Sequence, residues 1–189
     1  MVIVFNVGYT SKPWSAFDIE KYGLGGTEKC VALLSSALAE LGHEVYVVGQ
    51  IHENNIQDNP RYVRYENLNS TKPIYVYENL QAQVPKTIDL LVGVNYINYL
   101  VYFKDFEVKK NFFWIHNTDY YQWFEGEKLN EDLYHLNHRS IDRIVCLTEW
   151  HKETISQRYG VDKERIITIP NPIDNSKFLP FIFDDKIPN

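Results

Sequence analysis

The chain has 189 residues, of which 44% are hydrophobic, a size and composition typical of one globular domain with a buried core. Its 25 acidic and 19 basic residues give a formal charge of -6 and are spread along the chain, which argues against nucleic acid as a partner. Cys30 and Cys146 are too few for a disulfide scaffold, and no apolar run could form a signal peptide or transmembrane segment, so we expect a soluble cytoplasmic protein with reduced cysteines.

The first part of the chain predicts a strand, a long loop, a helix and a second strand. Residues 2–7 are apolar except for Asn6, as in a strand covered on both faces, whereas residues 9–24 have no periodicity. Apolar residues then recur at helical spacing until Gly42, and glycine is common directly after a helix. We therefore predict a helix that begins at residues 25–27 and stops at Gly42, followed by a strand over residues 43–49.

The rest of the chain alternates between apolar runs of strand length and segments of helical spacing. Strands are predicted, with weaker signals for the first two, over residues 62–65, 74–77, 89–94, 111–115, 143–147 and 166–169. Helices are predicted over residues 97–103, 129–140 and 150–159, the last ended by Gly160. This alternation is typical of an α/β fold with a single doubly wound parallel sheet, in which ligands bind at the carboxyl ends of the strands.

A glycine-containing stretch over residues 23–28 lies between the first strand and the first helix. The backbone amides of Gly25 and Gly26 at a helix N-terminus can hold a phosphate, and the alternative is that these glycines only permit a tight turn. A dinucleotide-binding fingerprint would need glycine where Glu28 stands, and it would need to follow the strand directly. The stretch therefore predicts an anion site or a turn, and it argues against a nicotinamide site.

His116 follows the predicted strand over residues 111–115. A histidine at such a strand end can position or stabilise a reacting group, and the alternative is a structural hydrogen-bonding role. The other histidines are expected on helices or loops. His135 and His138 have helical spacing, but no further histidine or cysteine completes a metal site, so metal binding is not expected.

Several short motifs occur in the order and spacing of one known family. They are Gly25-Gly26-Thr27-Glu28 at the helix start, Gly42-His43-Glu44-Val45 at the second strand, Ile115-His116, residues 142–150 and 159–161, and Pro170-Asn171-Pro172-Ile173-Asp174. Together they resemble the N-terminal domains of family 4 retaining glycosyltransferases over nearly the whole chain. One departure is Pro172, where the family usually has glycine. Proline fixes φ near about -65°, which affects the local turn rather than the fold.

The resemblance implies transfer of a sugar from a nucleotide-sugar donor to a glycan or other hydroxyl acceptor, with retention at the anomeric carbon. Gly25 and Gly26 would face the donor diphosphate, and His116 would be the catalytic residue that contacts the transferred sugar. The acceptor would bind in a cleft on this domain, with the candidate residues Tyr9, Trp14, Asp18, Lys21, Asn117, Asp119, Thr148 and Glu149. A solvated surface loop is the alternative for the first four, and Trp150 is expected in the core.

The resemblance also implies a two-domain GT-B architecture of which this chain is the N-terminal half. Residues 1–174 would form a Rossmann-like acceptor-side domain, and residues 175–189 a linker toward a C-terminal Rossmann-like donor-binding domain that is absent from this sequence. The chain alone would then be inactive, and no metal cofactor is implied. Two alternatives stay open: a non-catalytic module that binds a partner or a glycan, and an oxidoreductase or nucleotide-sugar epimerase built on a similar sheet.

Overall fold

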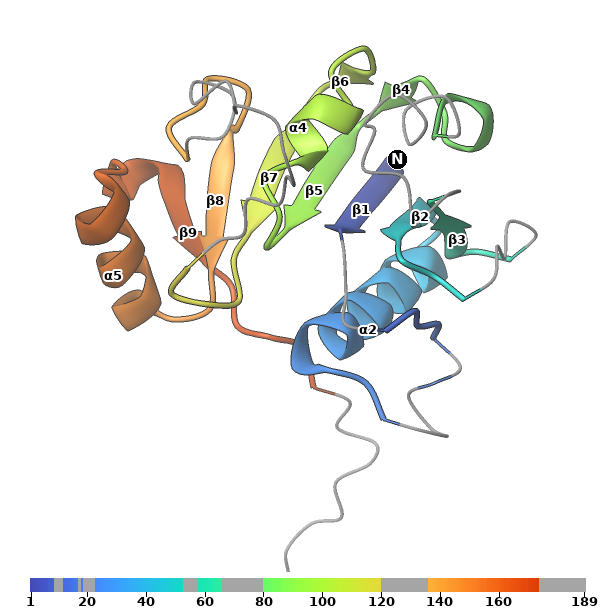
Figure 1. The fold of residues 1–189 in the computed structure, drawn as a ribbon, viewed down its shortest axis with the longest axis horizontal. Helices are drawn as coiled ribbons and strands as arrows, with labels where there is room; N and C mark the ends of the chain where they lie inside the picture. The colour runs from blue at the N-terminus through green and yellow to red at the C-terminus, as the bar shows by residue number, and fades with distance from the viewer. Residues whose placement is uncertain are drawn as a thin grey trace, which may run out of the picture.

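The computed structural model describes residues 1–8, 12–16, 18, 23–52, 58–65, 80–119 and 136–173. The main strands are β1 Val2–Gly8, β2 Glu44–Gly49, β3 Arg61–Arg64, β5 Leu90–Val94, β7 Asn111–Trp114, β8 Arg143–Cys146 and β9 Ile166–Thr168. They form one seven-stranded sheet in the order β3-β2-β1-β5-β7-β8-β9, and all neighbouring strands are parallel (Figure 1). The helices α2 Gly26–Glu40, α4 Tyr99–Tyr102 and α5 Glu149–Tyr159 connect these strands.

The strand order reverses between β1 and β5. The chain passes from β1 through α2 to β2 on one side, and β5 then pairs with β1 on the other, so that Val4 of β1 lies between Tyr46 and Leu91. Because the strands are parallel, their carboxyl ends share one edge of the sheet, which we call the carboxyl edge. The crevice beside such a reversal is the usual ligand position in doubly wound sheets.

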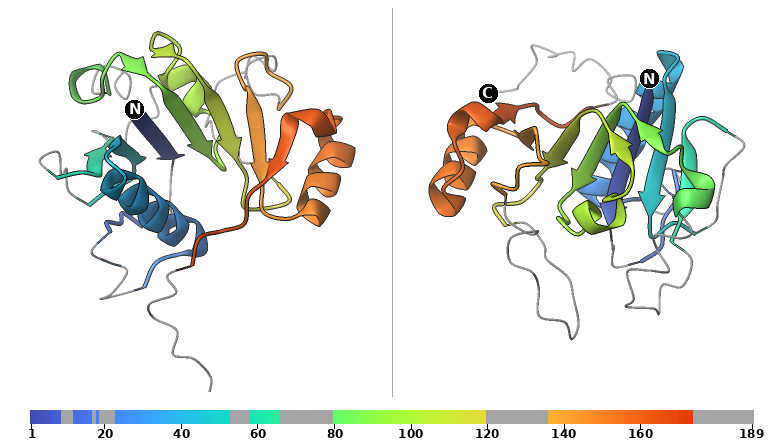
Figure 2. Two further views of the ribbon diagram at one scale, coloured as in Figure 1. Left: turned by 180° about the vertical axis from the view of Figure 1, so that it is seen from behind. Right: turned by 90° about the horizontal axis from the view of Figure 1, so that it is seen from above.

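Apolar side chains fill a layer on each face of the sheet. Ile3 and Phe5 of β1 pack in the same cluster as Val31 of α2, whereas Val4 points to the other face and packs in the cluster of Tyr99 in α4. This alternation is expected because successive side chains of a strand point to opposite faces. α2 lies along the face beside β1 and β2 (Figure 2). Helices on both faces confirm the predicted doubly wound α/β fold.

Most of the predicted elements are confirmed within one or two residues. Gly42 and Gly160 end their helices with φ of 85° and 63°, a conformation that glycine adopts readily. Two short strands, β4 Thr87–Ile88 and β6 Glu107–Val108, form a separate pair that was not predicted. α4 is shorter than the helix predicted over residues 97–103.

The predicted helix over residues 129–140 is wrong at its end, because residues 136–140 form turns, and its first part lies outside the described residues. The strand at 74–77 and the linker over 175–189 also lie outside them. Both cysteines are buried and reduced, as predicted. In the described part of the chain, no helix has the length and apolar character needed to cross a membrane.

Candidate functional site

The first turn of α2 presents free backbone amides at the carboxyl edge. Gly25 is the N-cap residue, and no side chain caps the helix there. The first intrahelical bond joins the Lys29 amide to the Gly25 carbonyl at 3.0 Å, so the amides of the preceding helical residues have no partner within the helix. Gly25 and Gly26 are both exposed. This arrangement can bind an anion through the amides and the helix dipole.

The two glycines differ in their surroundings. A β-carbon added to Gly25 would overlap the carboxylate of Glu28, whereas one added to Gly26 would meet nothing within 4 Å. The Glu28 carboxylate therefore lies over the helix start, where a negative charge is stabilised. An incoming phosphate at this position would have to displace that carboxylate.

His116 lies two residues after the end of β7 and is half-buried. Its Nε2 atom is buried and has no hydrogen-bond partner among the described residues. Its ring lies against that of Trp114, with the ring centroids 4.4 Å apart and the planes tilted by 50°. Burial, with a smaller contribution from the nearby His151, lowers the pKa of His116 from 6.5 to about 4. The ring is therefore neutral at physiological pH, and its buried Nε2 lacks a described hydrogen-bond partner.

Asn95 connects His116 to the first turn of α2. It follows β5, is 6% exposed, and has a φ of 58°, which is uncommon for a residue other than glycine. Its Oδ1 accepts the backbone amide of His116 at 2.8 Å, and its Nδ2 donates to Oγ1 of Thr27 at 3.4 Å. Three segments that are distant in sequence therefore meet at this side chain.

Sequence reasoning missed Asn95, although a signal for it exists. An asparagine directly after a buried parallel strand lies at the carboxyl edge, and asparagine is among the residues that tolerate positive φ. His151 was also missed, because its position in the helix gave no reason to connect it with His116. It is 5% exposed, and its Nε2 lies 2.7 Å from the carbonyl oxygen of Asn117.

The long loop after β1 does not supply an open cleft at Trp14. This residue is 3% exposed and packs edge-on against Tyr62, so its assignment to an acceptor cleft is corrected: it is part of the core. Asp18 closes a local turn, where its carboxylate accepts the Ser15 amide at 2.6 Å. The other two candidates on this loop, Tyr9 and Lys21, lie outside the described residues.

Of the candidates after β7, only Asn117 lies beside His116. Asn117 is exposed, and its backbone carbonyl lies against His151. Asp119 instead lies against the last turn of α5, where it accepts from Arg158 at 2.5 Å and from the Tyr159 hydroxyl at 3.0 Å. Asp119 is thus paired with α5, and its place in the acceptor cleft stays a prediction.

Thr148 and Glu149 are exposed, and each forms a hydrogen bond within the protein. Thr148 is the N-cap residue of α5, where its Oγ1 accepts the amide of His151 at 3.0 Å. Glu149 accepts a hydrogen bond from Thr168 of β9 at 2.5 Å. The prediction that Trp150 lies in the core is wrong, because this side chain is 70% exposed.

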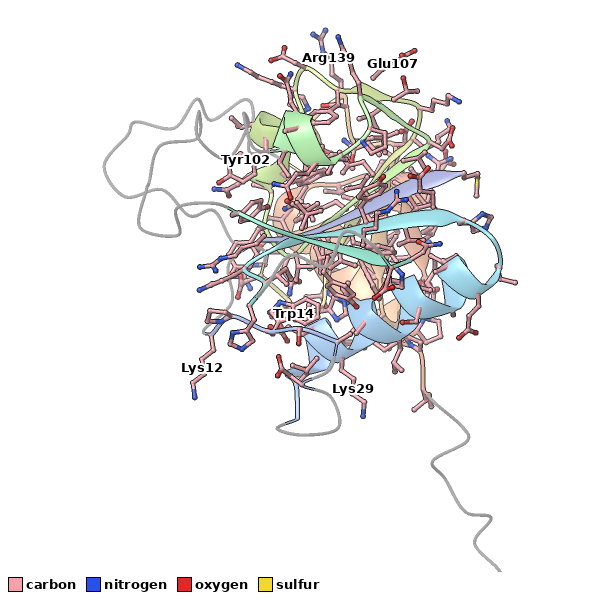
Figure 3. The ribbon with its side chains drawn as sticks, turned by 90° about the vertical axis from the view of Figure 1, so that its right-hand side faces the viewer. Lys12, Trp14, Lys29, Tyr102, Glu107 and Arg139 are labelled. Carbon is pink, nitrogen blue, oxygen red and sulfur yellow. The ribbon has the colours of Figure 1, made fainter. Side chains whose placement is uncertain are left out.

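A cavity of about 560 Å³ lies at the opposite edge of the sheet. It is lined by residues that include Leu91 near the start of β5, Phe103 and Arg139. Figure 3 shows Arg139 at the end of the molecule opposite to Lys29 in the first turn of α2. The cavity is therefore separate from the site around His116. Within the described residues, no group of His, Cys, Asp and Glu side chains could hold a metal ion.

Comparison with known proteins gives one family and one fold. The family model Glycosyltransferase Family 4 matches residues 24–177. The chain also superposes on the crystal structure of a glycosyltransferase from Rickettsia africae ESF-5, with a TM-score of 0.58 and 14% sequence identity. The match covers 95% of this chain and 46% of that one, so the chain spans about half the length of that protein. No curated protein matches the chain.

Proposed function

The chain belongs to glycosyltransferase family 4, and from this premise we propose that it is the acceptor-side domain of a retaining glycosyltransferase. The reaction would transfer a sugar from a nucleotide-sugar to a hydroxyl group of a glycan or other acceptor. A C-terminal Rossmann-like domain of the complete protein would bind most of the donor. The 189-residue chain alone would therefore be inactive.

The observation that carries this proposal is the Asn95 side chain, which joins the start of α2 to His116. Exposed helix amides suit a diphosphate, and a neutral imidazole with an unpaired nitrogen suits a sugar hydroxyl or ring oxygen. Through Asn95, the backbone of His116 is linked to the first turn of α2, an arrangement that suits a substrate carrying a diphosphate next to a sugar.

Each group would have its own part in the reaction. The amides at Gly25 and Gly26 would face the donor diphosphate after the Glu28 carboxylate moves aside. His116 would contact the transferred sugar through Nε2, which substrate binding would first have to expose. It would stabilise the sugar as positive charge develops at the anomeric carbon, since a neutral ring avoids electrostatic repulsion there. The leaving diphosphate would be stabilised by protein groups, and no metal is assigned to this step.

The acceptor would bind on this domain near Asn117, which is exposed beside His116. Asp18, Asp119, Thr148 and Glu149 stay candidates for the same cleft, and each has a contact within the protein that acceptor binding would have to accommodate. Asn117 comes first because it adjoins the proposed catalytic residue in the chain and is exposed. Tyr9 and Lys21 keep their place as proposals from the sequence.

The proposal is tested with the complete protein and a panel of UDP- and GDP-sugars. We expect release of nucleoside diphosphate that depends on an added acceptor, and a product whose anomeric configuration, determined by NMR, matches that of the donor. Glycan binding without any transfer would instead indicate the non-catalytic module. Turnover of a nucleotide-sugar without acceptor to an isomerised sugar would indicate the epimerase.

A second test uses the 189-residue chain alone in titration calorimetry with the same donors. We expect weak or undetectable binding, because this domain would supply only the amides at the start of α2. Sub-micromolar affinity would contradict the assignment of most donor contacts to a second domain.

A further inference from the structure

His151 bridges the segments that follow β7 and β8. Its Nδ1 accepts the backbone amide of Leu147 at 3.2 Å, and its Nε2 lies 2.7 Å from the carbonyl oxygen of Asn117. An amide N–H can only donate and a carbonyl can only accept. The ring is therefore the neutral tautomer with its proton on Nε2, and each of its nitrogens has a defined partner.

One of these bonds belongs to the cap of α5. The Oγ1 of Thr148 accepts the His151 amide at 3.0 Å, while the His151 side chain bonds back to the amide of Leu147. This reciprocal pattern is close to a capping box, in which glutamate or glutamine usually takes the third helical position. Glutamate would provide the acceptor for the cap. It would have no hydrogen to donate to Asn117.

The second bond fixes the backbone directly beside His116. The amide of His116 is bound by Oδ1 of Asn95, and the carbonyl of the next residue, Asn117, is bound by Nε2 of His151. The segment that carries the His116 side chain is therefore bound at both of its ends. His151 is 5% exposed, so water does not compete well for the Asn117 carbonyl.

We propose that His151 is a positioning residue for His116, acting through the backbone of Asn117. This inference rests on the proposed function, since it assigns His151 to the same catalytic site. A helix cap alone would use only the Nδ1 side of the ring. The Nε2 side extends the rigid start of α5 to the loop that aims His116 at the substrate.

Two substitutions separate the two sides of the ring. In His151→Asn the side-chain oxygen can take the place of Nδ1, which keeps the cap and loses the bond to Asn117. In His151→Gln the side-chain nitrogen can take the place of Nε2, which keeps the bond to Asn117 and loses the acceptor for Leu147. Both variants introduce a neutral amide side chain. They differ in the bond that they lose, which is the bond to Asn117 in one and the bond to Leu147 in the other.

We expect His151→Asn to melt lower than wild type, because the Asn117 carbonyl loses its buried donor, and its kcat to fall by about tenfold or more, because small displacements of a catalytic group can cost about a hundredfold in rate. The KM for the donor should change by less than about threefold, since the amides of α2 are untouched. We expect His151→Gln to melt lower and to keep kcat within about threefold of wild type. A His151→Asn enzyme with wild-type kcat would overturn the inference, as would two variants whose kcat falls only in proportion to their stability.

Amide hydrogen exchange gives a readout that does not depend on turnover. In the 189-residue chain, His151→Asn should speed exchange of the His116 amide by about tenfold or more relative to His151→Gln. Equal exchange in the two variants would overturn the positioning role. If the wild-type protein transfers no sugar, the proposed function fails, and this exchange comparison still decides whether His151 holds the His116 segment.

Discussion

The side-chain oxygen of Asn95 accepts the backbone amide of His116 at 2.8 Å. The two residues lie at the ends of neighbouring strands, and Asn95 also reaches Thr27 in the first turn of α2. A single buried side chain therefore relates the proposed phosphate-binding amides to the proposed catalytic histidine. Its removal should affect both the local structure and the reaction.

Substitutions of Asn95 separate its backbone conformation from its hydrogen bonds. Asn95→Gly removes the side-chain bonds but suits the φ of 58°, so we expect a loss of about 1 kcal/mol in the free energy of unfolding. Asn95→Ala removes the same bonds, and alanine must also adopt the left-handed backbone conformation of this position, which costs about 1 to 2 kcal/mol more than glycine. Both variants should lose activity to the same extent. Urea denaturation and kcat measure the two effects, and equal stability of the two variants would contradict this account.

A proline at Gly26 removes one amide from the start of α2 while keeping the helix. Gly26 is the first helical residue, where proline is favoured, and Gly25 has φ of -57° and ψ of 157°, which suits a residue before proline. One hydrogen bond to a charged group contributes about 1.5 kcal/mol. We therefore expect Gly26→Pro to raise the donor KM by about tenfold with little change in Tm.

The matched control is Gly26→Ala, which keeps the amide and adds a methyl group into open space. Its donor KM should equal that of wild type, and its Tm should be equal or slightly higher because alanine favours the helix. If Gly26→Pro binds the donor as well as Gly26→Ala does, the amide of Gly26 does not contact the diphosphate. The glycines then serve only the turn.

The buried state of His116 predicts a pH dependence of stability. Its pKa is lowered from 6.5 to about 4 in the folded protein, so between these values the unfolded state binds a proton that the folded state does not. The stability contributed by neutral His116 is complete above about pH 6.5 and decreases as the pH falls toward about 4. Wild type should therefore lose more Tm than His116→Gln between about pH 7 and about pH 4.5. If the Tm of wild type and that of His116→Gln fell equally over this pH range, the pKa of His116 would not be lowered in the folded protein.

Those parts of the fold that depend on long patterns could be predicted from the sequence. β1, β5 and β7 are mostly apolar runs because the sheet is covered on both faces, and Gly42 and Gly160 end helices in a conformation that favours glycine. β4 and β6 could not be predicted, because a two-residue strand has no periodicity. Their pairing depends on contacts between segments that are distant in sequence.

The place of two candidate site residues in the fold was predictable from their position in the chain. Gly25 comes directly before α2 and His116 shortly after β7, which places both at the carboxyl edge. The burial of Trp14 depends instead on a bridge to Ile51, which no local pattern reveals. Trp150 is exposed because its neighbour His151 and Ile155, one turn later, form the buried side of α5.

The most direct test of the central claim is His116→Ala in the complete protein, with kcat measured at saturating donor and acceptor beside Tm. His43→Ala is the control, since His43 lies at the amino end of β2, at the opposite edge of the sheet. Stabilisation aimed at charge in the transition state contributes about 3 kcal/mol, so we expect an approximately hundredfold lower kcat with Tm near that of wild type. A His116→Ala enzyme that keeps near-normal kcat, or one whose only change is a lower Tm, would contradict the catalytic role of His116.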